Sequence, residues 1–289
     1  MKGIILAGGT GSRLRPLTDF VCKQLLPVYD KPLIYYPLTT LILSGIKDIL
    51  IISTPEDLPK IKCCMGDGAL LGVRLSYAVQ DTPRGLADAF IVGEKFIDNH
   101  PVCMILGDNI LYKAKLSEFM MKSFSENRGA TIFSFPVQNP QRFGVVEMAI
   151  DTNQVLSLEE KPSKPKSNLA SIGLYVYDEN VTTYAKSLAP SHRGEIEITD
   201  LNKMYLEKGL LDCKKLSRGD IWIDAGVVES FSDASNLMRL IETRMGMKIG
   251  SPEEASYVMD NISKNDLKAL AENYKNSPYG AYLKRVADE

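Results

Sequence analysis

The N-terminal segment is the feature that most constrains the fold of this chain. Residues 2–6, KGIIL, form a short apolar run that leads directly into the glycine-rich segment 7–12, AGGTGS. A continuous apolar run that ends in glycine is typical of a strand buried on both faces, as in a parallel sheet. Glycine lets the backbone turn sharply and approach a ligand closely. We therefore expect a buried strand that delivers a glycine-rich loop.

Strand and helix patterns alternate through the first third of the chain. The apolar runs 49–53 and 102–106 and the alternating segment 73–79 predict further strands. Helical spacing predicts the helices between them, at 37–44, 57–65 and 85–96. This alternation indicates an α/β fold with a parallel sheet covered by helices on both faces.

The pattern changes in the remainder of the chain. After a predicted helix at 116–125, strand-like segments follow with few helices between them, at 130–136, 144–148, 155–160 and 171–177, which predicts antiparallel additions to the same sheet. From residue 230 the spacing becomes helical, with predicted helices at 230–245, 264–274 and 279–286. We expect a core of residues 1–229 and a helical C-terminal region, 230–289, that serves packing or oligomerisation.

Composition excludes several classes of protein. Of 289 residues, 45% are hydrophobic and 24% are charged, which is typical of a globular protein. The 34 Lys and Arg residues nearly balance the 36 Asp and Glu residues, so we expect neither nucleic acid nor a membrane surface as a partner. There is no apolar stretch of spanning length and no cleavable leader pattern, which together predict a soluble, cytoplasmic protein.

The sequence offers few cysteine and histidine side chains for catalysis or metal binding. Five cysteines without a CxxC pair predict neither a disulfide framework nor a zinc site, and they fit a reducing cytoplasm. His100 and His192 are the only histidines and are far apart in sequence, which argues against chemistry based on histidine. Carboxylates, lysines and arginines therefore have to supply any catalysis.

Cations follow the glycine-rich loop closely, at Arg13, Arg15 and Lys23. Exposed backbone N–H groups beside a cation suit a polyphosphate. The loop is not a Walker A motif, because no Lys-Ser or Lys-Thr follows it, and Leu14 replaces the last glycine of the dinucleotide fingerprint. A tight turn would explain the glycines but not the cations, and the incomplete fingerprint argues against a nicotinamide oxidoreductase.

The segment 3–37, GIILAGGTGSRLRPLTDFVCKQLLPVYDKPLIYYP, resembles the signature of the sugar-1-phosphate nucleotidylyltransferases, most closely their thymidylyltransferase branch. The resemblance continues over essentially the whole chain, in the segments LGDN at 106–109, RFGVVE at 142–147, LEEKP at 158–162, GEIEITD at 194–200 and WID at 222–224. It implies a Rossmann-like, three-layer nucleotidyltransferase fold, with a mixed, mostly parallel central sheet and a helical C-terminal appendage.

The resemblance also implies which residues act. The catalytic residues would be Arg13, Lys23, Asp108 and Lys161. The nucleotide would contact Gly8, Gly9, Thr10, Gly11, Ser12, Arg13, Gln24, Gln80, Gly85 and Asp108. The sugar would contact Asn109, Gly144, Glu160, Lys161, Ser171 and Tyr175. Asp108 and Asp224 would hold Mg²⁺, an ion that prefers one or two protein carboxylates together with phosphate oxygens.

The reaction implied is transfer of a nucleotidyl group from dTTP to glucose 1-phosphate, giving dTDP-glucose and pyrophosphate, by a homotetrameric enzyme. A UTP-dependent enzyme, or one acting on another hexose 1-phosphate, remains an alternative. A regulator that binds sugar nucleotides without turnover is a more remote one. Phe143, Ile172 and Val227 stand where the family usually carries hydroxyl groups, which leaves the identity of the sugar open.

Overall fold

Strand β1 (Lys2–Leu6) lies in the middle of the central sheet. In this computed structural model, which describes residues 1–9, 11–150 and 154–289, β1 pairs in parallel with both β4 and β6, and β4 pairs in parallel with β5. These strands are β4 (Asp48–Ser53), β5 (Arg74–Val79) and β6 (Val102–Leu106). Successive side chains of β1 point to opposite faces, and both Ile4 and Ile5 are fully buried. The parallel half of the sheet is confirmed.

The other half of the sheet is largely antiparallel. Strand β11 (Leu169–Tyr177) runs antiparallel to β6, β8 and β9, and β10 runs antiparallel to β9. The expected strands are β8 (Ala130–Pro136), β9 (Gly144–Met148) and β10 (Val155–Glu160). An additional strand, β12 (Leu211–Lys215), pairs in parallel with β8 and was not expected.

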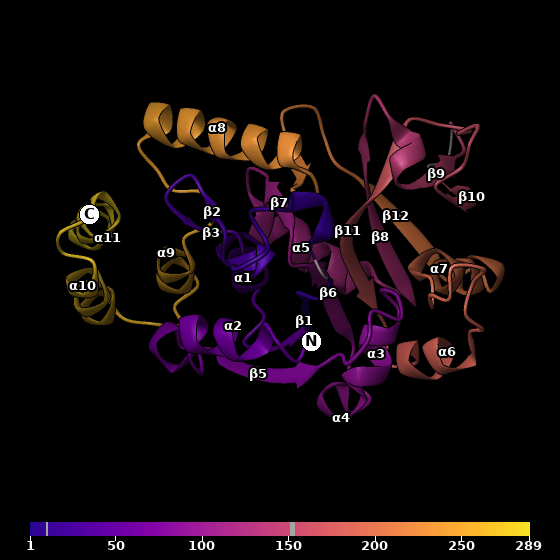
Figure 1. Cartoon of the computed structure of the whole chain (residues 1–289), viewed down its shortest axis with the longest axis horizontal. Helices are drawn as coiled ribbons and strands as arrows, with labels where there is room; N and C mark the ends of the chain where they lie inside the picture. Colours follow the sequence, from indigo (N-terminus) through magenta and orange to yellow (C-terminus); the bar gives the residue numbers. More distant parts are fainter. Residues whose placement is uncertain (10, 151–153) are drawn as a thin grey trace.

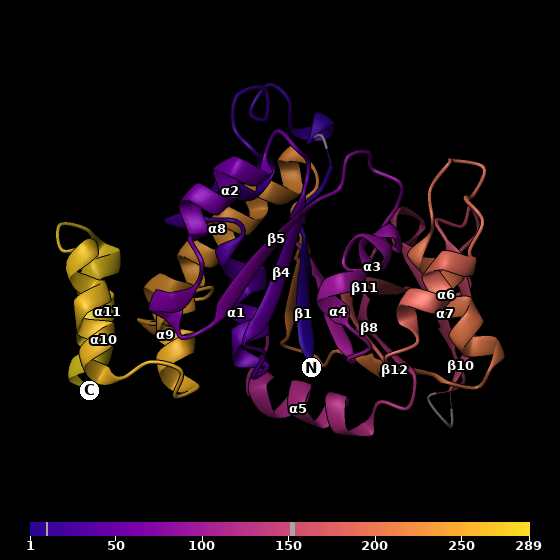
Figure 2. The same cartoon turned by 90° about the horizontal axis from the view of Figure 1, so that it is seen from below.

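Helices cover both faces of this sheet, as Figure 2 shows. On one face Phe90, Tyr177 and Tyr205 belong to a single apolar cluster, to which α3 (Asp88–Val92), α6 (Val181–Ser187) and α7 (Ile198–Glu207) contribute. The opposite face packs against α1 (Tyr35–Leu43), α2 (Leu58–Met65), α5 (Leu116–Glu126) and α9 (Pro252–Val258). The predicted three-layer α/β fold is therefore confirmed.

The helix expected over residues 85–96 is interrupted. The structure has α3 and then α4 (Glu94–Ile97), which meet at Gly93. Residues before α3 are extended along Ile196 instead, because the Ala87 amide donates to the Ile196 carbonyl and the Ile196 amide donates to the Arg84 carbonyl. Gly85 has a φ of +105°, and a side chain there would lie 2.4 Å from the Ile196 oxygen. Tertiary contacts thus displace the start of the helix.

Two short ribbons lie outside the central sheet. Strand β2 (Pro27–Val28) pairs with β3 (Lys31–Pro32), and β7 (Asn109–Tyr112) pairs in antiparallel fashion with β13 (Ile221–Asp224). These strands are too short to show a clear alternating pattern in the sequence. The second ribbon places residues that are more than 100 positions apart side by side.

Helices α10 (Lys264–Asn273) and α11 (Pro278–Asp288) form the end of the molecule marked C in Figures 1 and 2. Helix α8 (Val228–Met245) packs on β2 and β13 through an apolar cluster that includes Val28, Ile110 and Met238. Helices α10 and α11 pack on each other around their own cluster. Helix α9 was not expected from the sequence. The division of the chain into a core, 1–229, and a C-terminal region, 230–289, stays a prediction. No described helix combines the length and the apolar character needed to cross a membrane.

Candidate active site

A polar cleft of about 440 Å³ opens at the carboxyl ends of β1 and β6. Ligands of open α/β sheets bind at this edge. The glycine-rich loop after β1 forms one side of the cleft, and residues of β9, β10, β11, α7 and β13 form the other. The cleft therefore brings together segments from most of the length of the chain.

The glycine-rich loop has backbone angles that favour glycine. Gly9 has a φ of +101° and Gly11 a φ of +61°. The Thr18 hydroxyl donates to the Gly11 carbonyl at 2.8 Å, and a side chain at position 11 would collide with Thr18. Gly9, Gly11 and Ser12 line the cleft, Gly8 lines the cavity beside it, and Thr10 lies outside the described residues.

Five basic side chains line the cleft. They come from separate segments and are Arg13, Lys23, Arg142, Lys161 and Arg193. The Lys23 ammonium forms an ion pair with the Asp108 carboxylate. Five acidic side chains, Asp108, Glu160, Glu195, Glu197 and Asp224, also line the cleft. Cations suit phosphate groups, and carboxylates can take up a metal ion or sugar hydroxyls.

Asp108 and Asp224 lie in the same cleft. Asp108 follows β6, and the β7–β13 ribbon places Asp224 opposite Asn109. Burial, together with the negative charge of Asp108, raises the pKa of Asp224 to about 6, although Lys23 opposes this shift. No cluster of three or more acidic, histidine or cysteine side chains that could hold a metal occurs among the described residues. The two carboxylates alone fit Mg²⁺, whose other ligands would be phosphate oxygens and water.

A smaller cavity adjoins the cleft and is lined by Gly8, Gln24, Gln80 and Gly85. The Gln80 side-chain N–H donates to the buried Asp88 carboxylate at 2.8 Å. Because a carboxylate only accepts hydrogen bonds, this contact fixes the orientation of the Gln80 amide. The Gln80 carbonyl oxygen therefore faces Gly8 as an acceptor.

The predicted sugar-side residues line the far wall of the cleft. Glu160, at the end of β10, accepts a hydrogen bond from the Thr199 hydroxyl at 2.5 Å. Its other carboxylate oxygen lies 3.4 Å from the Lys161 ammonium and 3.7 Å from the Arg193 guanidinium. The wall is completed by Asn109, Gly144, Ser171 and Tyr175.

Asn109 lines the cleft but has both ends of its amide engaged within the protein. It donates to Asp108 at 2.9 Å, and its oxygen accepts from the Gly173 amide at 3.1 Å and from the Trp222 indole at 2.6 Å. Such a side chain is suited to holding Asp108 and Trp222 in place.

Sequence reasoning missed several residues of the cleft. Arg193 is not among the site residues expected from the sequence, but its side chain lines the cleft and pairs with Glu197 at 2.8 Å. Arg193 directly precedes the GEIEITD segment, and this position in the sequence could have indicated that it belongs to the site. Arg142, Thr199 and Trp222 lie within quoted motifs, yet only the structure brings them to the cleft.

Two of the residues that depart from the family pattern lie in different environments. Phe143 lines the cleft, with its ring 5.2 Å from that of Trp222 in an edge-to-face contact. Ile172 is buried in the apolar cluster on the α1 face of the sheet. A hydroxyl lost at Phe143 would therefore have faced the cleft, whereas one lost at Ile172 would not.

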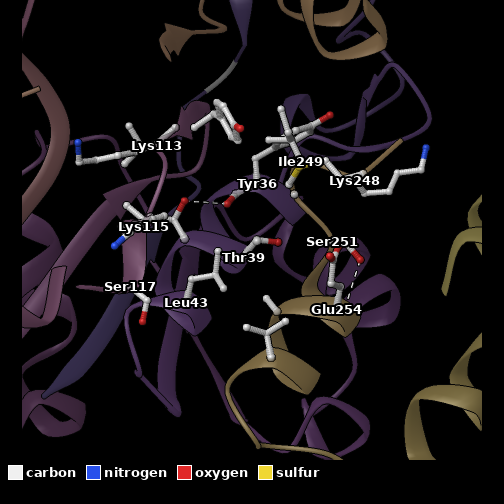
Figure 3. A pocket seen from close by; sticks show the side chains of 18 residues that line it. Tyr36, Thr39, Leu43, Lys113, Lys115, Ser117, Lys248, Ile249, Ser251 and Glu254 are labelled. Atoms are coloured by element: carbon white, nitrogen blue, oxygen red, sulfur yellow. Dashed lines mark hydrogen bonds between the residues drawn. The ribbon is translucent and has the colours of Figure 1, made fainter. Parts of the chain in front are cut away.

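A second cavity, of about 280 Å³, lies on the α1 face of the sheet (Figure 3). It is lined by Thr39 and Leu43 of α1, by Lys113 after β7 and by Ser251 and Glu254 at the start of α9. The described residues that line it include none of the site residues expected from the sequence.

Comparison with known proteins agrees with the geometry. The family model described as "Nucleotidyl transferase" matches residues 2–239. A glucose-1-phosphate thymidylyltransferase of Neisseria meningitidis is 48% identical, with 99% of each chain covered. One of Mycolicibacterium smegmatis is 49% identical, with 100% of this chain and 99% of the relative covered.

A solved structure gives the same result. The crystal structure of a Bacillus anthracis protein, described as a glucose-1-phosphate thymidylyltransferase, superposes with a TM-score of 0.76 at 42% identity, covering 83% of this chain and 95% of that one. The likeness in sequence and structure, together with a cleft rich in cations at the carboxyl edge of the sheet, shows that this chain belongs to the nucleotidyl transferase family and groups with its glucose-1-phosphate thymidylyltransferases.

Proposed function

We propose that this chain transfers a thymidylyl group from dTTP to glucose 1-phosphate, giving dTDP-glucose and pyrophosphate. The observation that supports this most is the cleft itself, where the glycine-rich loop, five basic side chains and the pair Asp108 and Asp224 meet beside the Gln80 cavity. The relatives named above carry the name of this activity.

The reaction needs no nucleophilic side chain. A phosphate oxygen of the sugar phosphate attacks the α-phosphorus of the triphosphate, the bond from that phosphorus to the bridging oxygen breaks, and the electron pair leaves with pyrophosphate. The obstacle is the approach of two anions. Fixed cations lower it by stabilising charge and by positioning both substrates. In this proposal Arg13 and Lys23 neutralise the triphosphate, and Lys161 holds the sugar phosphate.

Asp108 and Asp224 would hold Mg²⁺. The ion supplies Lewis-acid stabilisation of phosphate charge when it is bound. The Lys23 ammonium pairs with the Asp108 carboxylate, which brings a cation to the carboxylates that would hold the ion.

The sugar end of the cleft is organised around Glu160. Its hydrogen bond from Thr199 and its neighbours Lys161 and Arg193 fix the carboxylate. A carboxylate so held accepts hydrogen bonds from sugar hydroxyls. Lys161 has a φ of +43°, a strained backbone conformation that is often found at functional sites.

The base end selects through Gln80. Its free oxygen can accept a hydrogen bond from the imide N–H of thymine or uracil, but cytosine has no N–H at that ring position. The methyl group that distinguishes thymine from uracil contributes about 0.8 kcal/mol when buried. We therefore expect dTTP first and UTP second.

We further propose that the protein is a cytoplasmic homotetramer and that residues 230–289 contribute to its subunit contacts. Exposed apolar side chains on α8 and at the end of α9, Leu240, Met245 and Val258, support the oligomer. The cysteines at the described positions 22, 63, 64, 103 and 213 are all free thiols, which fits a reducing compartment.

The test is pyrophosphate release measured over a matrix of nucleoside triphosphates and sugar 1-phosphates, with and without Mg²⁺. We expect dTTP with glucose 1-phosphate to give the highest kcat/KM. Preference for ATP or GTP would overturn the base-site proposal, and preference for another hexose 1-phosphate would favour the alternative left open by Phe143.

A further inference from the structure

The β7–β13 ribbon has the candidate metal ligands at one end and an ion pair at the other. Its register pairs Asp224 with Asn109 and Ile221 with Tyr112. At the cleft end the ladder continues, because the Ala225 amide donates to the Asp108 carbonyl at 3.0 Å. At the far end the same register places Asp220 opposite Lys113.

The apolar pattern of the ribbon leaves its register open. Ile221 and Ile223 pack in one apolar cluster and Trp222 packs in another, on the opposite face. A slip by one residue would exchange the two faces and is excluded by burial. A slip by two residues would put one isoleucine where the other had been, and it would move Asp224 by about 7 Å along β7. Other contacts have to specify the register, and the hydrogen bond from the Trp222 indole to Asn109 is one of them, near the cleft end.

Lys113 and Asp220 make such a contact. The Lys113 ammonium lies 2.9 Å from the Asp220 carboxylate, and the two side chains are only 13% and 8% exposed. The same carboxylate oxygen accepts the Ser217 amide at 2.6 Å, which closes the turn that leads into β13. Phe119 covers the ammonium group, with its ring centre 4.7 Å away. Breaking a buried, hydrogen-bonded ion pair is costly, so the pair opposes a slip.

We propose that Lys113 and Asp220 are positioning residues that lock the register of the β7–β13 ribbon and thereby hold Asp224 beside Asp108. The proposal rests on the proposed function only in assigning the metal to these two carboxylates. A slip would displace Asp224, whereas Glu160 and Lys161, the charged residues of the sugar wall, lie outside the ribbon. The pair should therefore control metal affinity more than sugar affinity.

The experiment uses the full chain and the substitutions Lys113→Met, Asp220→Asn and both together. Mn²⁺ binding without substrates is followed by the loss of its EPR signal, and initial rates are measured against Mg²⁺, dTTP and glucose 1-phosphate. We expect each variant to bind Mn²⁺ about tenfold more weakly or worse, which corresponds to 1.4 kcal/mol. The KM for glucose 1-phosphate should stay within about twofold, and excess Mg²⁺ should recover part of the lost kcat.

The double variant separates positioning from simple stability. Each single variant leaves one buried charge without its partner, so its melting temperature should fall, and the double variant should recover much of that loss. Its weak Mn²⁺ binding should persist, because the register is still unlocked. Recovery of Mn²⁺ affinity together with the melting temperature would overturn the proposal, and so would wild-type Mn²⁺ affinity in all three variants.

Lys214→Met provides the matched control. Lys214 on β12 pairs with Glu126 at the end of α5 at 2.6 Å, so its substitution also removes an ion pair between two elements, neither of which belongs to the ribbon. It should leave Mn²⁺ binding and rates unchanged. If the wild-type chain released no pyrophosphate from any substrate pair, the proposed function would fail, while the Mn²⁺ titration would still decide the role of Lys113 and Asp220.

Discussion

Replacing Asp224 by Asn should make the metal-free protein more stable while removing most of its activity. The pKa of Asp224 is raised from 3.8 to about 6 by burial and by the charge of Asp108. Because the folded pKa lies above the unfolded one, the folded state binds more protons between pH 4 and 6, and its stability falls as the pH rises through that interval. At pH 7.5 the ionised carboxylate therefore destabilises the fold.

The size of this effect follows from the shift. About two pKa units at 1.36 kcal/mol each give a ceiling of about 3 kcal/mol for the destabilisation at neutral pH. Asparagine keeps the shape but carries no charge, so Asp224→Asn should raise the free energy of unfolding by about 1 to 3 kcal/mol. For a chain of this size that corresponds to a melting temperature roughly 2 to 6 °C higher.

The assay is thermal unfolding in EDTA at several pH values from 5 to 8, with Asp212→Asn on the exposed side of β12 as the control. The wild type should lose stability relative to Asp224→Asn as the pH rises to about 6, and the control should follow the wild type. Added Mg²⁺ and dTTP should stabilise the wild type more than the variant. If Asp224→Asn melted at or below the wild-type temperature in EDTA at pH 7.5, the assignment of a charge conflict between Asp108 and Asp224 would be refuted.

Three further predictions concern the substrates and the assembly. Replacing Arg13 or Lys161 by Met should lower kcat/KM by about 10- to 150-fold, since each variant loses a charge-assisted hydrogen bond of about 1.5 to 3 kcal/mol. The melting curves should be nearly unchanged, and full activity in steady-state assays would contradict the roles of these residues. Gln80→Met should reduce kcat/KM for dTTP and UTP by about tenfold and leave the KM for glucose 1-phosphate unchanged. A raised KM for glucose 1-phosphate with unchanged kcat/KM for dTTP would contradict this role of Gln80. Light scattering of the intact protein should give four times 32.0 kDa, and deletion of residues 230–289 should reduce the oligomer size or the solubility; a monomer at micromolar concentration would argue against the tetramer.

Local sequence patterns determined much of this protein. The apolar run before Gly8 predicted β1, and the apolar run 102–106 predicted β6, after which Asp108 lies in the cleft. These predictions succeed because the formation of a buried strand and of the glycine turn after it is determined by residues that are adjacent in the sequence. The resemblance of the motifs then indicated the family, which the comparisons confirm.

Contacts between distant segments decided the rest. Four features left no periodic signal in the sequence. They are the break between α3 and α4, the hydrogen bond from Gln80 to Asp88, the position of Arg193 in the cleft and the pairing of β7 with β13. Each depends on partners that only the folded chain brings together. The sequence by itself determined which strands and loops this protein would form and which chemistry they could carry. Only the tertiary structure decided which of their hydrogen-bonding groups and charges remain available to a ligand. Burial and the contacts of each side chain with neighbouring groups determine this.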